Sequence, residues 1–128
     1  MSQPTLTPAD EEALITTAEE CIGGHLRSIT YFTDDTVDQL YLRDYLEANA
    51  NLESFAEAER PGFHIDIDQQ NTELGAFDFT IRVFERGYVV SVLADGHGVF
   101  VTCDSMDMPE FKELGEALET TLHEIVGE

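Results

Sequence analysis

One short segment combines residue types that could bind a metal. His64, Asp66 and Asp68 occupy alternate positions, so in a β-strand their side chains would lie on the same face. An imidazole and two carboxylates placed in this way can bind a divalent cation. However, the residues between them are apolar, which is equally typical of an ordinary half-buried strand, and acidic residues occur throughout the chain. We therefore predict no metal site here.

A second segment, Asp95-Gly96-His97-Gly98, could form a flexible ligand-binding loop. An imidazole titrates near neutral pH, so His97 would be the reactive group of such a loop. The same residue types are also those of a tight hairpin turn, because glycine accepts a positive φ. We predict a turn.

Known catalytic motifs are absent from the sequence. The glycines match neither GxxxxGK[ST] nor GxGxxG, and no serine lies in a GxSxG motif. His25 and His123 have no serine, cysteine or carboxylate at a spacing that defines a triad. We therefore expect a protein that is not an enzyme and has no cofactor.

The charge of the chain is strongly unbalanced. Asp and Glu number 27 against six Lys and Arg, which gives a formal net charge of −21, and the carboxylates are spread over the whole length. Self-repulsion at this density is relieved in concentrated salt, where the Debye length falls to about 3 Å near 1 M. The composition favours a halophilic protein and argues against nucleic acid as a partner, since phosphate binding needs clustered Lys and Arg.

Membrane and secretion signals are also missing from the sequence. No apolar run approaches the ~20 residues needed to span a bilayer, and the first residues have no basic or apolar leader region. Cys21 and Cys103 are far apart and form no CxxC motif. We expect a cytoplasmic protein that does not bind membranes and whose two cysteines are reduced.

The first half of the chain predicts a helix, a hairpin and a second helix. Residues 8–22 carry apolar side chains at helical spacing, with Thr7 as cap and two glycines at the end. Residues 26–43 are rich in β-branched and aromatic types around Asp34-Asp35, which favours two strands over a helix through 37–46. Residues 44–60 then give an amphipathic helix.

The second half predicts three strands and a last helix. Residues 63–74 mix strand-like and loop-like composition, and we expect an irregular excursion there. From Phe77 to Val83 apolar residues alternate with polar ones, which indicates a strand with one buried face. Two further strands follow, separated by glycine turns, and residues 108–126 carry a helical apolar stripe.

The resulting order is α-β-β-α-β-β-β-α. The connections are short, and the apolar helix stripes need a sheet for burial, so we predict an α+β fold with one five-stranded antiparallel sheet and helices on both faces. No repeat or linker divides the chain, which predicts a single domain over residues 1–128.

This element order resembles the roadblock/dynein light chain group of profilin-like folds, over about residues 8–126. In that group the first and last helices lie on one face of the sheet and the middle helix on the other. The segments LRSITYF, VDQLYLRDYL and FTIRVFERGYVVSVL also resemble small proteins of halophilic archaea.

The roadblock resemblance implies a role in protein interaction. Roadblock-like proteins are generally not enzymes; they dimerise through the middle helix and the neighbouring strand, and act as scaffolds or regulators of small GTPases. It implies a homodimer or heterodimer that binds a protein partner, such as a small GTPase or an ATPase. The implied interface is formed by helix 44–60 and strand 77–85, with the residues Tyr45, Ala48, Leu52, Phe55, Phe79 and Ile81.

An alternative is a small-ligand sensor, because related sheet-and-helix folds hold metabolites between the sheet and a helix. In that case the segment 63–76 would act as a lid, and His64 and Arg82 would supply polar contacts.

Overall fold

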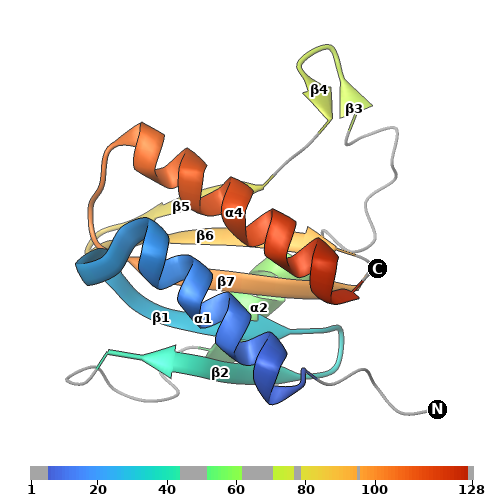
Figure 1. The fold of residues 1–128 in the computed structure, drawn as a ribbon. Helices are drawn as coiled ribbons and strands as arrows, with labels where there is room; N and C mark the ends of the chain where they lie inside the picture. The colour runs from blue at the N-terminus through green and yellow to red at the C-terminus, as the bar shows by residue number, and fades with distance from the viewer. Residues whose placement is uncertain (1–5, 44–51, 62–70, 77–78, 95, 127–128) are drawn as a thin grey trace.

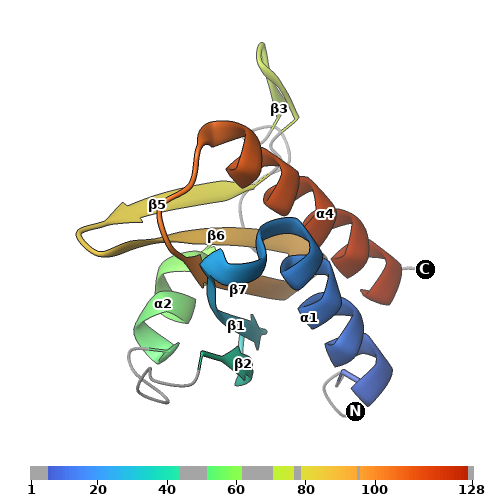
Figure 2. The same cartoon turned by 60° about the vertical axis from the view of Figure 1, so that its left-hand side comes forward.

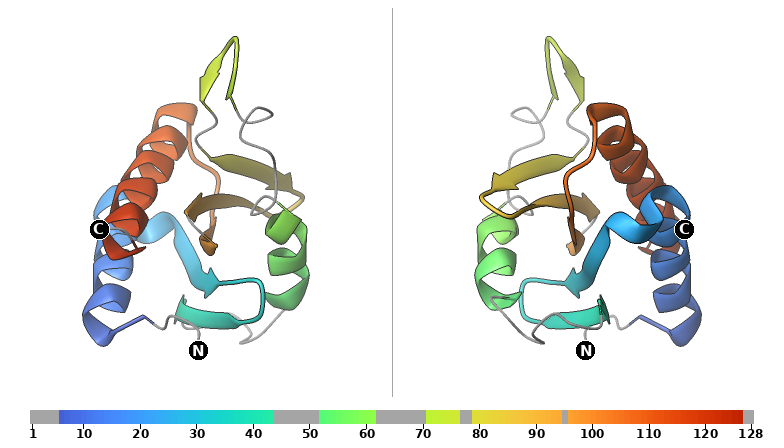
Figure 3. Two further views of the ribbon diagram at one scale, coloured as in Figure 1. Left: turned by 90° about the vertical axis from the view of Figure 1, so that its right-hand side faces the viewer. Right: turned by 90° about the vertical axis from the view of Figure 1, so that its left-hand side faces the viewer.

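The chain folds into three layers, with a β-sheet between helices (Figures 1 and 3). The computed structural model describes residues 6–43, 52–61, 71–76, 79–94 and 96–126. Helices α1 (Pro8–Ile22) and α4 (Met108–Val126) pack side by side on one face of the sheet, and α2 (Leu52–Glu59) lies on the other. This confirms the predicted arrangement of helices on both faces. None of the described helices is long and apolar enough to cross a membrane.

The central sheet has five strands in the order β2-β1-β7-β6-β5, and every pairing is antiparallel. The predicted sheet is therefore confirmed, and β2 and β5 are its edge strands. The strands are β1 (Leu26–Phe32), β2 (Val37–Leu42), β5 (Thr80–Phe84), β6 (Gly87–Ala94) and β7 (His97–Cys103).

Helix α1 begins with the predicted cap. The Asp10 amide donates to Thr7 Oγ1 at 3.0 Å, and the Thr7 amide donates to Asp10 Oδ2 at 3.2 Å. This reciprocal capping box satisfies two amides that have no partner inside the helix. The helix ends at Gly23, whose φ of 47° is unfavourable for other residues.

The hairpin of β1 and β2 is closed by a local hydrogen-bond network. Thr33 Oγ1 accepts the amides of Asp35 and Thr36, and the Thr33 amide donates to the Thr36 carbonyl. These bonds stabilise the polar turn around Asp34-Asp35 that the sequence predicts. The hairpin is confirmed, and the alternative of a helix is wrong for residues 37–42.

One predicted segment is described only in part, and another differs from the structure. Helix α2 agrees with the second half of the predicted helix 44–60, and residues 44–51 lie outside the described part of the chain. The expected irregular excursion instead contains a small hairpin of β3 (Asn71–Thr72) and β4 (Gly75–Ala76). Gly75, with φ of 99°, allows the tight turn, and the hairpin stands away from the central sheet (Figures 1 and 2).

The predicted turn between β6 and β7 is confirmed. Ala94 pairs with His97, so the connection has two residues, and Gly96 adopts a φ of 81°. The register also places Gly98 against the ring of Phe32, where a Cβ atom would lie 2.4 to 2.8 Å from ring carbons. Glycine is required at residue 98 because β7 and the Phe32 ring approach so closely.

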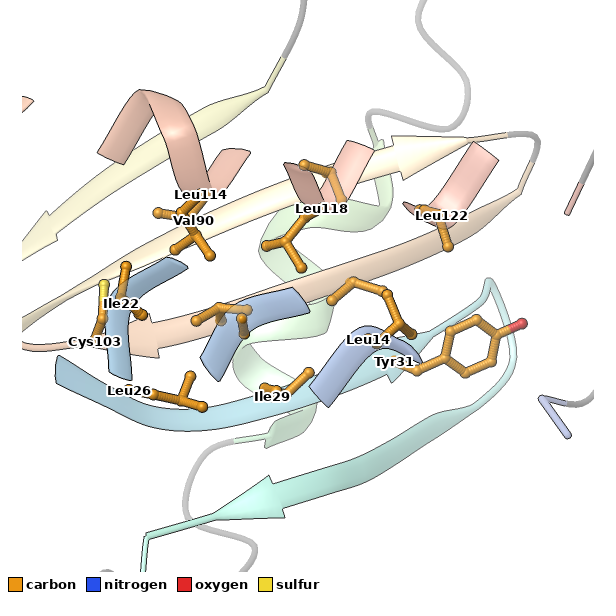
Figure 4. Close-up of a cluster of buried hydrophobic side chains, with 14 of the residues drawn as sticks. Leu14, Ile22, Leu26, Ile29, Tyr31, Val90, Cys103, Leu114, Leu118 and Leu122 are labelled. Carbon is orange, nitrogen blue, oxygen red and sulfur yellow. The ribbon is translucent and has the colours of Figure 1, made fainter. Parts of the chain in front are cut away.

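The sheet separates two apolar clusters. The larger one fills the space between the sheet and the helices α1 and α4, and includes Leu14, Ile29, Val90, Leu118 and Leu122, all at 0% exposure (Figure 4). The smaller one lies under α2 and consists of Phe32, Ala56, Val89 and Phe100. Each fully buried Leu, Ile or Val contributes about 1.5–3 kcal/mol to folding, so the α1/α4 side holds most of the stabilisation.

Candidate protein-interaction surface

The outer edge of β5 is open in the described structure. β5 pairs with β6 on one side and has no strand neighbour on the other among the described residues. Phe84 and Gly87 flank a two-residue turn, and such flanking residues exchange hydrogen bonds. Because the pattern alternates, the backbone amides and carbonyls of Ile81 and Val83 point away from β6. An edge of this kind can pair with a strand of another chain.

Two apolar side chains are exposed at this edge. Val83 is 72% exposed and Phe84 is 45% exposed. The alternation of the sequence predicts a buried Val83, and this prediction is wrong. Helix α4 packs along β6 and β7 and leaves the end of β5 uncovered, where the β5–β6 hairpin extends beyond the helices (Figure 2).

Aromatic contacts connect β5 to α2. The rings of Phe55 and Phe84 meet edge to face, with centroids 5.6 Å apart, and Phe55 also packs against Phe100 at 5.5 Å. Such pairs contribute about 0.5–1.5 kcal/mol beyond the area that they bury. Phe84 is therefore held in place although nearly half of it is exposed.

An ion pair also joins α2 to β5. The guanidinium of Arg82 donates through Nε to Glu59, whose side chain is 6% exposed, and through Nη2 to the Ala58 carbonyl at 3.2 Å. Arg82 itself is 41% exposed. Burial of a carboxylate is costly unless it is paired, so this contact fixes the end of α2 against the edge strand. We call Phe55, Arg82 and Phe84 the β5–α2 surface; Val83 lies beside it on the opposite face of the sheet, where it pairs with Tyr88.

The carboxyl end of α2 is held at a second point. Arg60 donates to the carbonyls of Thr33 at 2.8 Å and Thr36 at 3.2 Å, at the turn of the β1–β2 hairpin. It also pairs with the exposed Glu57 at 3.2 Å. Helix α2 is thus bonded to the edge strand β5 and to the turn between β1 and β2.

The structure distributes the predicted interface residues over both faces of the sheet. Phe55 lies in the β5–α2 surface. Phe79 and Ile81 pack instead against the large cluster on the α4 side, where a Cβ atom on Gly115 would lie 2.4 Å from the Phe79 ring. Of the remaining predicted interface residues, Tyr45 and Ala48 lie outside the described residues, and Leu52 is described in its backbone alone.

Sequence reasoning missed Val83, Phe84 and Glu59 as residues of interest. The signal for the first two was present, because two consecutive apolar residues before the turn Glu85-Arg86 break the alternation of a one-sided strand. Glu59 could not be recognised, since its partner Arg82 lies 23 positions away in a chain rich in acids.

The alternative ligand site is described only in part. His64 lies outside the described residues, and Arg82 is bonded to Glu59. On the α2 face of the sheet, however, the side-chain oxygens of Thr30 and Ser91 are buried and have no hydrogen-bond partner among the described residues. Both residues pair with Phe100, which lies between them.

The hairpin histidine contacts a buried tyrosine. Tyr31, 2% exposed, forms a 2.6 Å hydrogen bond between its hydroxyl and Nδ1 of His97. Burial raises the pKa of Tyr31, and the nearby carboxylates of Asp38 and Asp10 raise it further. The tyrosine thus stays protonated, and the pair anchors the turn to β1.

A charged cluster lies at the opposite end of β1. Asp104 accepts from Arg43 at 3.0 Å and from Arg27 at 3.4 Å, while Arg43 also donates to the carbonyls of Leu26 and Gly24. The hydrogen bond from Arg43 lowers the pKa of Asp104, with a further contribution from Arg27. The cluster fixes the end of β2 to the start of β1, and we interpret its role as structural.

Among the described residues, the cysteines and potential metal ligands form no reactive cluster. Both cysteines are free thiols, and burial raises the pKa of Cys103 to about 12. Within the described ranges, no three His, Cys, Asp or Glu side chains gather as metal ligands. Asp66 and Asp68 lie outside these ranges.

Comparison with known proteins identifies a family and a fold. The family model for a domain of unknown function, DUF7522, matches residues 12–123. Among solved structures, the gliding protein MglB from Thermus thermophilus is 15% identical, with a TM-score of 0.63 over 96% of this chain and 99% of that chain. MglB in a tetrameric arrangement is 14% identical, with a TM-score of 0.62 over 98% of this chain and 100% of that one. No curated protein matches the sequence. At these identities the structural likeness shows a shared roadblock-like fold.

Proposed function

This chain belongs to the DUF7522 family, a domain of unknown function, and from that premise we propose that it is a non-enzymatic interaction module whose β5–α2 surface binds another protein. The observation that carries the proposal is the open edge of β5, a strand bonded to α2, where Phe84 is exposed on the α2 face and Val83 on the opposite face. Monomeric proteins usually cover or charge such an edge.

The partner that we propose first is a second copy of the chain. Roadblock-like proteins dimerise through the middle helix and the neighbouring strand, and α2 and β5 hold these positions here. The acidic side chain of Glu59 does not oppose this contact, because it is buried against Arg82. The net charge of −21 does oppose it at low salt, so the dimer should form best in the concentrated salt of a halophilic cytoplasm.

The dimer would serve as a scaffold or regulator of a small GTPase or, in second place, of an ATPase. Support comes from the roadblock-like fold, which this chain shares with MglB structures over nearly its full length. Binding of the purified dimer to small GTPases loaded with GDP or with a non-hydrolysable GTP analogue tests this step. Equal absence of binding to both nucleotide states would count against a GTPase.

Light scattering at several protein concentrations in about 1 M KCl, where the Debye length is about 3 Å, tests the dimer. We expect a dimer for the wild type and a monomer for Phe84→Asp, because the substitution places a carboxylate in the apolar contact. Leu74→Asp is the matched control: Leu74 is 92% exposed on the separate β3–β4 hairpin, so this variant should remain dimeric. A wild type that stays monomeric, or an equal loss in both variants, would contradict the proposal.

A second candidate function is a small-ligand sensor, favoured by the buried hydroxyls of Thr30 and Ser91. A buried hydroxyl without a partner costs free energy that a polar ligand between sheet and helix could recover. Thermal-shift measurements in high salt with nucleotides, divalent cations and metabolites would detect such a ligand. The double variant Thr30→Val/Ser91→Ala should abolish any stabilisation observed.

A further inference from the structure

We infer that a second interaction site lies at the start of α4 and binds an acidic segment of another protein that carries an apolar side chain beside its carboxylates. The site consists of Val83, Tyr88 and Met108, which we call the Met108 patch. It lies on the α4 face of the sheet, whereas the β5–α2 surface, which includes Phe84, lies on the other face. The inference therefore goes beyond the proposed dimer, and both surfaces can be occupied at the same time.

The apolar side chains of the Met108 patch come from two strands and one helix. Val83 pairs with Tyr88 across β5 and β6, so the two side chains are neighbours on the α4 face. The ring of Tyr88 packs against Phe111 of α4, with centroids 5.0 Å apart. Met108 precedes Phe111 by three residues, which places both on the same side of the helix. These residues therefore form one continuous apolar surface.

The outer part of this surface is open to solvent. Phe111 is 4% exposed, but Val83 is 72% and Met108 is 57% exposed. Helix α4 begins at Met108, and the β5–β6 hairpin extends beyond the helices at this end (Figure 2). Two exposed apolar side chains that lie around one buried ring are a surface that a partner would gain free energy by covering.

The two basic side chains that flank the patch are free to bind a partner. The chain has six Lys and Arg, and four of them form ion pairs: Arg27, Arg43, Arg60 and Arg82. Among the described residues, Arg86 and Lys112 form no ion pair. Arg86 lies in the turn that follows Val83 and Phe84, Lys112 lies one helical turn after Met108, and both are exposed.

These two cations select the charge of the partner. At a net charge of −21, most of the surface repels a carboxylate, whereas Arg86 and Lys112 can pair with one. A basic partner would be attracted to any part of this acidic surface, so charge would not direct it to the Met108 patch. Charge complementarity therefore favours an acidic segment.

The start of α4 does not compete for the carboxylates of the partner. Asp107 and Glu110 form a reciprocal capping box, in which the Asp107 amide donates to Glu110 Oε1 at 3.1 Å and the Glu110 amide donates to Asp107 Oδ1 at 3.2 Å. These carboxylates already occupy the place that an anion would take at the helix start. The partner's carboxylates would therefore bind the side chains of Arg86 and Lys112.

Salt separates the contributions of the apolar and the charged residues. Near 1 M salt the Debye length is about 3 Å, so exposed ion pairs are strongly screened. Burial of Val83 and Met108 should then supply most of the affinity. The two cations should determine which segment is bound, and their effect should grow as the salt concentration falls.

The class of partner is tested by selection from a library of random short peptides displayed on phage, with the wild-type protein immobilised in about 1 M KCl. We expect the enriched sequences to place Asp or Glu beside Leu, Ile, Phe or Met. An enriched peptide is then synthesised with a fluorescent label. Its dissociation constant is measured by anisotropy in this buffer and at the lowest KCl concentration at which circular dichroism shows the native fold.

Substitutions at the patch and outside it locate the bound peptide. We expect Met108→Ser to weaken binding about tenfold at both salt concentrations, because part of an apolar contact is lost. Arg86→Gln/Lys112→Gln should weaken binding at the lower concentration and have little effect in molar KCl. Leu74→Ser, an exposed apolar position on the β3–β4 hairpin, and Phe84→Ser, on the α2 face, are the matched controls and should bind like wild type.

Each remaining outcome overturns the inference. These outcomes are a selection that enriches no sequence or sequences without acidic residues, and a Met108→Ser variant that binds like wild type or no more weakly than Leu74→Ser. A change in oligomeric state in Met108→Ser, measured by light scattering, would show that a second copy occupies the patch. The proposed dimer fails separately: a monomeric wild type that binds the acidic peptide through Met108 would reject the dimer and support this site.

Discussion

Glu59, near the end of α2, is buried against the guanidinium of Arg82 on the edge strand β5. The two residues differ in their access to water, since the side chain of Glu59 is 6% exposed and that of Arg82 is 41% exposed. The pair connects helix α2 to strand β5, and these two elements carry the β5–α2 surface. Its asymmetry has a measurable consequence for stability.

Removal of Arg82 should destabilise the fold more than removal of the charge of Glu59. In Arg82→Met the buried carboxylate loses its counter-charge, and we expect a loss of about 3–5 kcal/mol in the free energy of unfolding. In Glu59→Gln the remaining guanidinium can be hydrated, so the loss should be smaller, about 1–2 kcal/mol. Urea unfolding in molar KCl measures both. Glu57→Gln, an exposed change on the same helix, is the control and should stay within about 0.5 kcal/mol.

Equal losses in the two variants would show that the ion pair does not have the burial asymmetry described. Losses no larger than that of Glu57→Gln would show that the pair does not hold α2 in place. Either result would remove the argument that Glu59 is neutralised within the proposed interface.

Gly115 in α4 leaves room for the ring of Phe79, which lies on the neighbouring face of the sheet. A Cβ atom at this position would be 2.4 Å from ring carbons, so Gly115→Ala should destabilise the protein by about 1–3 kcal/mol. Helix propensity favours alanine over glycine by about 1 kcal/mol, which offsets part of this destabilisation. Thermal unfolding of Gly115→Ala, Phe79→Leu and the double variant forms a cycle that isolates the contact. Additive effects in this cycle would contradict the packing of Phe79 against α4.

The elements of the fold could be predicted where the signal is local. The Thr7 cap with the stripe of α1, the polar turn between β1 and β2, and the glycine turn before His97 each lie within a few residues of sequence. These signals combine into a five-stranded antiparallel sheet because short connections leave few other topologies.

The candidate surface could be predicted only in part. Phe55 and the choice of α2 and β5 followed from the resemblance, but the alternating pattern placed Val83 on the buried face. Burial of a strand residue depends on how far α4 extends over the sheet, which is a tertiary property that period-two alternation does not contain. The Glu59–Arg82 pair escaped for a similar reason, since nothing local distinguishes one of many glutamates.

Acid stability should depend on Asp104. Hydrogen bonds from Arg43 and then Arg27 lower its pKa from the ordinary value of 3.8. A carboxyl whose pKa is lower in the folded state stabilises the protein above its unfolded pKa and loses that contribution as the pH falls through the folded value. We therefore expect Asp104→Asn to cost about 0.5–1 kcal/mol at neutral pH, discounted for partial exposure, with the difference from wild type vanishing in strong acid.

The charge-matched control for this prediction is Asp38→Asn, at an exposed position on β2. It removes the same formal charge from an acidic surface, so it should be neutral or slightly stabilising at low salt. Urea midpoints across the acid range measure both variants. Two results would contradict a stabilising interaction of ionised Asp104 with Arg27 and Arg43. One is a destabilisation of equal size in both variants, and the other is a difference for Asp104→Asn that persists in strong acid.

The two thiols should differ in reactivity because of their surroundings. Cys103 is fully buried, and burial raises its pKa to about 12, so alkylation near pH 8 requires the sheet to open. Cys21 is half-buried, and burial together with Glu113 and Glu20 raises its pKa, which should slow but not prevent its reaction. Mass spectrometry after iodoacetamide treatment should therefore find Cys21 modified first. The Cys21→Ser variant should remain unmodified until denaturant unfolds it, and rapid labelling of this variant in its native state would mean that β7 opens far more readily than its buried position implies.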